Sequence, residues 1–198
     1  MHQLILTVIA LSLIAGMSIV TVNYLPAWAN GAKDAHILVR DGARTLIKAF
    51  ELRAQAHDGV APMPEDAYPD FGLAAFYSNY YPFLPRAPQG YSWFYGFTPA
   101  VTLSSYGYPG AISNNNTDDS SDDGLFWFCL APVNGGASEG VYRGIRRAQQ
   151  VFPETQMYVN SALGAQCGEP VNSAEPSSFP ANTVVTFFVR YIPDNPVE

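Results

Sequence analysis

The feature that most constrains this chain is its N-terminal segment, because the first 32 residues contain no Asp, Glu, Lys or Arg. Its most apolar part, Leu4–Val22, consists of Leu, Ile, Val, Ala, Met and Gly with two Ser and two Thr. About 20 such residues span the hydrocarbon core of a bilayer as a helix, and helical Ser and Thr bond their own backbone carbonyls. The sequence therefore predicts a hydrophobic N-terminal helix over residues 1–32.

Three interpretations of this helix are open. A cleaved secretory signal fits the Ala-x-Ala pattern at 27–29, but the segment starts with only His2 as a basic group and its apolar run is longer than usual. A retained membrane anchor explains the run. A helix held in lipid before assembly and later packed among copies of itself explains it too, and it fits the missing basic leader if a leader was removed before Met1. We favour this third interpretation.

Charge divides the chain into two parts. Residues 1–57 carry five basic and three acidic groups, whereas residues 58–198 carry five and fourteen. The net charge of −7 leaves no excess of cations to displace counterions, so no nucleic-acid partner is expected. A chain of 198 residues that is 48% hydrophobic and 14% charged is also not a disordered one, and its length suits one domain.

Helical periodicity continues beyond the apolar segment. Over Ala35–Arg53, apolar side chains recur at steps of three and four residues, and charged side chains fill most positions between them. This pattern predicts an amphipathic continuation of the helix over residues 33–57, with one face for a core. The helix is expected to end near His57, because a glycine and two prolines follow within seven residues.

Two residues are expected to interrupt the long helix, namely Gly16 and Pro26. Proline has no amide hydrogen and disrupts the hydrogen bond to the residue four positions back. A kink or an unwound stretch is therefore predicted between them. An ordinary linker at Asn30-Gly31 is the alternative.

Residues 58–198 are predicted to form a head rich in strands and turns, since prolines interrupt every long helical period up to residue 109. A short helix is predicted over Val141–Val151. Aromatic residues crowd the stretch 68–108 and are expected either in the core of the head or in contacts between subunits. Strands are predicted over Tyr91–Phe97, Ala100–Ser104, Leu125–Leu130, Met157–Val159 and Thr183–Ile192.

The head contains two cysteines, Cys129 and Cys167, whose bond would close a loop of 39 residues. A chain with a membrane or export segment is expected in an oxidising compartment, where such a pair forms a disulfide. A metal site with two cysteine ligands is the alternative, which the absence of histidine from the head disfavours.

Other polar patterns allow two interpretations each. The acidic loop 113–124 offers the oxygen ligands that Ca²⁺ requires, but a solvated turn explains it equally well. The sequence at 115–117 matches a glycosylation acceptor. Arg143, Arg146 and Arg147 form either a solvated helix face or a contact to acidic groups of a neighbouring subunit.

The sequence carries none of the common enzyme signatures. It contains no Gly-rich phosphate loop followed by Lys-Ser/Thr and no G-x-S-x-G turn. His36 and His57 lie 21 residues apart on the predicted helix and suggest no nucleophile–base pair. We therefore predict no enzymatic activity and no cofactor or metal.

The layout of the chain resembles that of type IV pilins and pilin-like subunits. The resemblance rests on the apolar Leu4–Val22, the amphipathic Ala35–Arg53, the loop from Asp58 and the Cys129–Cys167 pair. It implies an α+β fold, in which a long N-terminal helix packs on a small antiparallel β-sheet head and a disulfide encloses a C-terminal region. Pilins usually carry a glutamate near the mature N-terminus, where this chain has the apolar run Leu4–Leu6, which implies a different register or a minor component.

The resemblance also implies a function. The chain would be a structural subunit of an extracellular filament, inserted in the inner membrane before assembly and forming a helical homo-oligomer. The alternative is a secreted or membrane-anchored periplasmic binding domain whose N-terminal segment is cleaved or retained. The residues expected to pack in the filament core are Leu4, Leu6, Ile9, Leu13, Ile14, Met17 and Val20.

Overall fold

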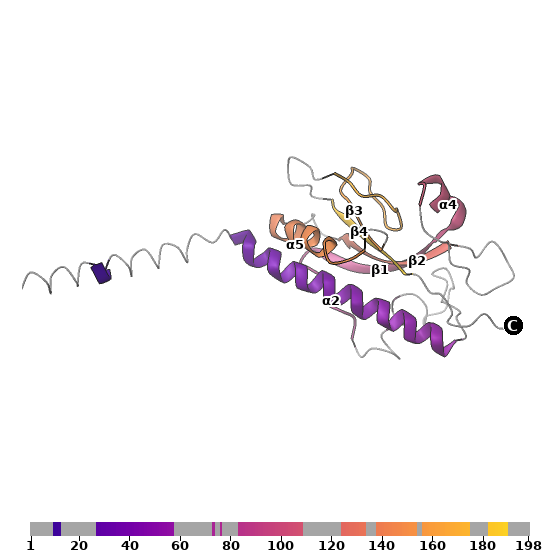
Figure 1. The fold of residues 1–198 in the computed structure, drawn as a ribbon, viewed down its shortest axis with the longest axis horizontal. Helices are drawn as coiled ribbons and strands as arrows, with labels where there is room; N and C mark the ends of the chain where they lie inside the picture. Colours follow the sequence, from indigo (N-terminus) through magenta and orange to yellow (C-terminus); the bar gives the residue numbers. More distant parts are fainter. Residues whose placement is uncertain are drawn as a thin grey trace, which may run out of the picture.

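The computed structural model has an α+β fold in which one long helix lies along a four-stranded antiparallel sheet (Figure 1). The structure describes residues 10–12, 27–57, 73, 76, 83–108, 124–133, 138–153, 156–174 and 182–189. The elements in chain order are α2 (Ala27–Ala56), β1 (Tyr91–Pro99), α4 (Ala100–Ser105), β2 (Gly124–Pro132), α5 (Glu139–Gln149), β3 (Met157–Asn160) and β4 (Val184–Val189).

The sheet has the order β1-β2-β4-β3, and all three strand pairs are antiparallel. The chain leaves the centre of the sheet after β2, forms α5, enters the far edge as β3 and returns as β4 between β2 and β3. Phe187 of β4 lies opposite Phe128 of β2 on one side and Met157 of β3 on the other. This register places the three side chains on one face of the sheet, since successive side chains of a strand alternate between faces.

Helix α2 packs on that face through a stripe of apolar residues. Ala35, Val39, Ala43, Leu46 and Phe50 are almost completely buried, at steps of three and four residues. The stripe follows from the sequence periodicity, because such positions share one side of an α-helix. Toward its C-terminal end, the stripe ends in Phe50, whose ring stacks on Phe76 and meets the rings of Phe126 and Phe128 at steeper angles.

The two faces of the sheet are covered differently. Helices α2 and α5 cover one face, where α5 contributes Val141, Ile145 and Ala148 to the main core. On the other face, Leu103 of α4 packs with Leu125, Tyr158 and Phe188 in a smaller buried cluster. The sheet is therefore buried on both sides, which explains why β3 and β4 consist entirely of buried residues.

Most sequence predictions of elements are confirmed. The amphipathic helix, the strands at β1, β2, β3 and β4 and the short helix at α5 are all present. The strand predicted over Ala100–Ser104 is wrong, because these residues form α4, in which Leu103 is buried while Val101 is 77% exposed. A strand would have placed both side chains on the same face, and only one of them finds a partner there.

The region around the start of α2 also differs from one expectation. Helix α2 runs without interruption through Asn30 and Gly31, so the linker considered at this pair is not seen. The predicted boundary between residues 1–32 and 33–57 lies inside this one helix. The predicted break points Gly16 and Pro26 lie outside the described residues.

Candidate assembly surface

The contact between α2 and α5 fixes the part of the molecule next to the apolar segment. Gly140 and Gly144 lie one helical turn apart on α5, against the backbone of α2. A Cβ atom at Gly144 would lie 2.5 Å from the carbonyl oxygen of Ala32 and 2.6 Å from the Cβ atom of Ala35. Only glycine allows the two backbones to come this close.

An aromatic–cation pair lies at the start of the same contact. The guanidinium group of Arg143 lies 4.4 Å from the ring centre of Trp28, in the first turn of α2. The same guanidinium forms a salt bridge of 2.9 Å with Glu139. Stacking on an indole stabilises an exposed cation by about 0.5–1 kcal/mol. The pair therefore holds Arg143 beside the N-terminal turn of α2.

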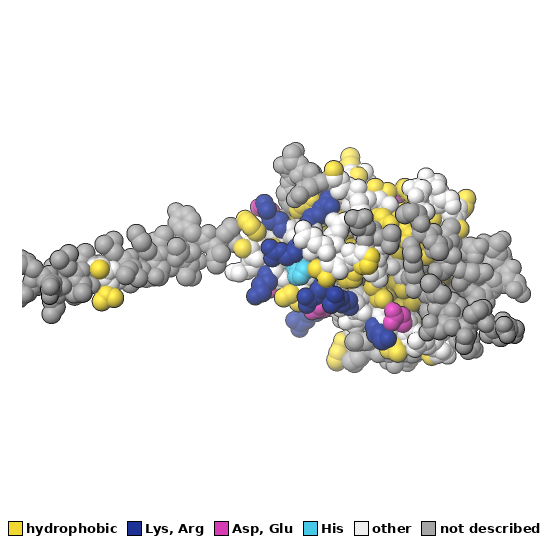
Figure 2. All heavy atoms as spheres, in the orientation of Figure 1, with side chains coloured by type: hydrophobic (Ala, Val, Ile, Leu, Met, Phe, Trp, Pro, Cys, Tyr) yellow, Lys and Arg dark blue, Asp and Glu magenta, His cyan; other side chains and the backbone are white. Residues whose placement is uncertain are grey.

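Cations from both helices form what we call the cationic surface, defined as Lys33, Arg40, Arg44, Arg143 and Arg147. The three from α2 are seven and four residues apart, so they lie on one side of that helix. Figure 2 shows Lys and Arg side chains gathered over this part of the molecule, around histidine atoms coloured cyan. Within the described residues, Lys33, Arg44 and Arg147 form no salt bridge.

His36 lies where α2 meets α5 and is affected by the cationic surface. Burial lowers the pKa of His36 below its usual value, and the nearby Arg40 and Arg147 lower it further. The buried Nδ1 atom of His36 has no hydrogen-bond partner. Asp41 acts in the opposite direction and raises the pKa of His36. The pKa of the Asp41 carboxyl group is itself lowered by its hydrogen bond from Arg40. The surroundings of His36 therefore favour the neutral form of its side chain over the charged form.

Arg146 has a structural role that separates it from its neighbours Arg143 and Arg147. Its guanidinium donates hydrogen bonds to the Tyr142 hydroxyl at 3.0 Å, to Gln149 Oε1 at 3.0 Å and to the carbonyl oxygen of Ser173 at 2.9 Å. Arg146 thus ties α5 to the segment that follows the second cysteine. Of the three arginines predicted as one basic cluster, Arg146 therefore forms hydrogen bonds within the head, whereas Arg143 and Arg147 are exposed.

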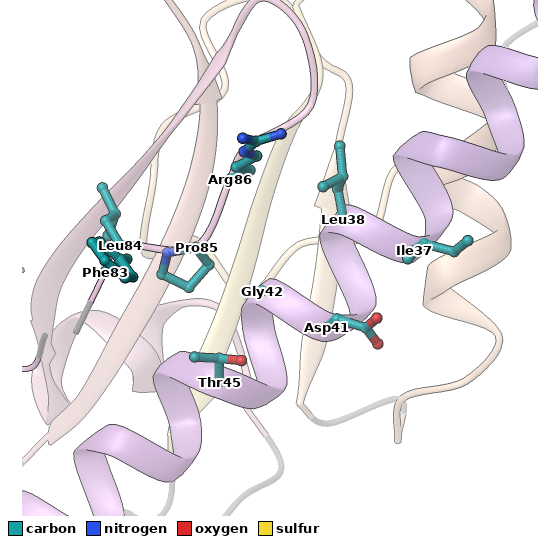
Figure 3. Close-up of a pocket in the computed structure, with 9 residues that line it drawn as sticks. All are labelled: Ile37, Leu38, Asp41, Gly42, Thr45, Phe83, Leu84, Pro85 and Arg86. Carbon is teal, nitrogen blue, oxygen red and sulfur yellow. The ribbon is translucent and has the colours of Figure 1, made fainter. Parts of the chain in front are cut away.

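An apolar groove lies on the other side of α2 from α5. It has a volume of about 290 Å³ and lies between α2 and the segment 83–86 (Figure 3). Pro85 approaches the helix at Gly42, where a Cβ atom would lie 2.6 Å from Trp93 Cζ2. Phe83 is 79% exposed at the groove, so it adds apolar surface that the described residues do not cover.

The predicted disulfide is present, with Cys129 and Cys167 bonded at 2.06 Å on the face of the sheet opposite α2. A chain of hydrogen bonds holds the residues beside it. Trp127 Nε1 donates to Thr98 Oγ1 at 2.9 Å, Thr98 Oγ1 donates to the Gly168 carbonyl at 3.0 Å, and the Gly168 amide donates to Thr186 at 3.1 Å. The disulfide segment is therefore fixed to three strands.

A second polar network holds the segment after the disulfide. Asn160, at the end of β3, donates to Glu169 Oε2 at 2.8 Å and accepts a hydrogen bond of 2.8 Å from the Ser173 hydroxyl. The Asn172 side chain accepts from the Val159 amide at 2.8 Å. Residues 167–174 thus cover the outer edge of β3.

Other predicted site residues lie outside the described residues. These include the acidic loop up to Asp123, and the expected filament-core residues Leu4, Leu6, Ile9, Leu13, Ile14, Met17 and Val20. Among the residues that the structure does describe, no group of His, Cys, Asp or Glu could hold a metal ion. The predictions of no cofactor and no enzymatic activity stay predictions.

Sequence reasoning missed the groove and the glycine contact. The spacing of Gly140, Gly144 and Ala148 by four residues was a visible signal for close helix packing, whereas nothing in the sequence placed 83–86 beside α2.

No described helix is both long and apolar enough to cross a membrane. Comparisons with family models, curated proteins and solved structures found no match to this chain.

Proposed function

We propose that this chain is the structural subunit of an extracellular type IV pilus-like filament and polymerises through its N-terminal helix. The observation that carries the proposal is the placement of α2. This 30-residue helix begins five residues after the apolar Leu4–Val22, and its apolar stripe is packed on the sheet of the head. The helix is therefore an integral part of the head, as expected of a subunit whose helix is built into a filament core.

The proposed assembly exchanges one apolar environment for another. The segment Leu4–Val22 lies in the inner membrane before assembly and among identical segments afterwards, so its apolar surface stays out of water in both states. Burial contributes about 25 cal/mol per Å² of apolar surface. A free subunit in water would thus aggregate, and neither state requires catalysis or a cofactor.

The exposed features of the head are available for contacts with neighbouring copies. The cationic surface and the groove lie along α2 between Lys33 and Thr45. A helical homo-oligomer buries parts of this side because the helices of its subunits approach one another in the core. Phe83 and Ile37 at the groove supply apolar contact area.

The test is assembly by cells that produce the full chain. Filaments are sheared from the cell surface, imaged by electron microscopy and analysed by intact mass. We expect filaments whose subunit retains Leu4–Val22, and we expect Ile14→Arg to abolish them. The matched control Gln150→Arg adds the same charge at an exposed position after α5 and should assemble normally.

Two results would overturn the proposal. Normal filaments from the Ile14→Arg variant would exclude a core built from this segment. A mature chain that starts at Asn30 and is released without filaments would show a cleaved signal, and the secreted binding domain would replace the filament subunit.

A further inference from the structure

Charge is distributed very unevenly along this chain. The described residues carry nine basic and five acidic side chains, whereas the remaining residues carry one basic and twelve acidic ones. The described part of an acidic protein is therefore cationic. Lys33, Arg44 and Arg147 form no salt bridge with another described residue, so carboxylates of another part of the chain, or of another copy, can pair with them.

Three members of the cationic surface, Lys33, Arg143 and Arg147, lie at one end of the head. Gly144 and Arg143 contact α2 at Ala32 and Trp28, so α5 and its Arg147 lie beside the first third of α2. Lys33 lies in the same third and is exposed. This end is the one to which the apolar segment is joined (Figure 1).

The densest acidic segment, 118–123, directly precedes Gly124 in the chain, and Gly124 lies at the opposite end of the head. It contains four Asp in six residues and lies between the described Tyr108 and Gly124. Gly124 pairs with Pro99 at the end of β1, and the ring of Phe126 lies 5.7 Å from that of Phe50 near the C-terminus of α2. At a rise of 1.5 Å per residue, Phe50 lies roughly 25 Å along α2 from Lys33.

We propose that the cationic surface of one subunit binds the acidic segment 118–123 of the next subunit along the filament. The inference rests on the proposed function, because it requires subunits that repeat in one direction. In such a head-to-tail arrangement, one end of each head meets the opposite end of its neighbour. Arginine forks and a lysine then pair with carboxylates, which fixes the register between heads and excludes reversed packing.

Cross-linking identifies the bound segment directly. Filaments of the full chain, grown from mixed unlabelled and ¹⁵N-labelled subunits, are treated with a carbodiimide that joins lysine amines to carboxylates in direct contact. We expect Lys33 to be joined to the tryptic peptide 87–143 at one of the aspartates of segment 118–123, and not at Glu139 of the same peptide, in pairs of mixed isotope composition. Pairs of one isotope composition only, or joining to the acidic peptide 54–86 instead, would overturn the proposal.

Charge reversal tests whether the contact matters for assembly. The double variant Lys33→Glu/Arg147→Glu should lower the yield of sheared filaments at least tenfold, and adding Asp118→Lys/Asp119→Lys to the same chain should restore most of it. The control Lys48→Glu makes the same charge change on α2 as the Lys33→Glu half of the double variant, about 22 Å further along the helix at 1.5 Å per residue. A normal yield from the double variant, or no restoration by the swapped charges, would refute the contact.

These outcomes are separate from failure of the proposed function. If Ile14→Arg abolishes filaments while the charge variants assemble normally, the filament proposal stands and the head-to-tail contact does not. If wild-type cells produce no filaments, both proposals fail together.

Discussion

The indole ring of Trp127 lies directly over Gly96, its partner on the neighbouring strand. A Cβ atom at position 96 would lie only 2.1 Å from Trp127 Cζ2. The glycine therefore leaves room for the ring, and the ring covers the backbone that glycine leaves bare. Because the same indole donates a hydrogen bond to Thr98, this cross-strand pair orients the bonds that hold the disulfide segment.

We predict that Gly96→Ala destabilises the head. The added methyl group displaces the Trp127 ring, and overpacking of this kind costs about 1–3 kcal/mol. Urea unfolding of the full chain in detergent, followed by tryptophan fluorescence, measures the effect. The control Ser92→Ala changes a residue on the same strand and face without adding bulk. Equal stability of the Gly96→Ala chain and the wild type would contradict the packing seen here.

The helix contact gives a matched pair of glycine substitutions. Gly144→Ala should destabilise the chain by about 1–3 kcal/mol, because the new methyl group meets the α2 backbone. Gly31→Ala should instead be neutral or stabilise it by up to about 1 kcal/mol, since a Cβ there has ordinary contact distances and alanine favours helix. Thermal unfolding followed by circular dichroism compares the two, and the same sign for both would argue against a tight α2–α5 contact.

Adjacent arginines on α5 should respond differently to the same change. Arg146→Met removes hydrogen bonds to the Ser173 carbonyl and to Tyr142 and should cost about 1–3 kcal/mol. Arg147→Met removes an exposed cation and should change the free energy of unfolding by less than about 0.5 kcal/mol. Hydrogen exchange provides a second readout, because only Arg146→Met should speed exchange in residues 170–174.

The lowered pKa of His36 predicts a loss of stability in mild acid. Below the usual pKa of 6.5, the unfolded chain binds a proton at His36 that the folded chain resists, so falling pH favours unfolding. His36→Gln should make the melting temperature less dependent on pH between 7 and 5. His57→Gln, at the exposed end of α2, is the control. A wild-type pH profile in the His36→Gln chain would show that His36 does not set this dependence.

Removal of the disulfide should cost about 4 kcal/mol, from the chain entropy of a loop of this length. Cys129→Ala/Cys167→Ala tests this value by urea unfolding under non-reducing conditions. Wild-type protein with reductant should approach the stability of the variant. If the variant unfolds at the wild-type urea concentration, the bond contributes nothing to stability.

The sequence predicted an element correctly where a single residue pattern was strong, as in an apolar periodicity or an unbroken apolar run. The apolar periodicity of Ala35–Arg53 became the buried face of α2, and the apolar run Leu125–Leu130 became a central strand buried on both sides. The disulfide was predicted from two cysteines in a chain that was expected to carry a membrane or export segment. For the helix and the strand, the apolar residues themselves determine which sides are buried.

Sequence reasoning failed where tertiary contacts decide the outcome. Ala100–Ser104 has β-branched residues typical of a strand, yet burial of Leu103 alone favours a short helix, and the Ser104 hydroxyl donates to the Ala100 carbonyl. The division of Arg146 from Arg147 depends on where residues 173–174 lie. Such contacts between distant segments leave no trace in local sequence.

The way α2 lies on the head has a mechanical consequence. In a filament of the proposed kind, tension runs along the helices of the core and reaches each head through α2. Because the apolar stripe from Ala35 to Ala54 is in contact along its length, a pull along the helix must slide all of these contacts at once. The close backbone approach at Gly144 blocks such sliding sterically. A head held in shear in this way withstands a larger load than one peeled from its end.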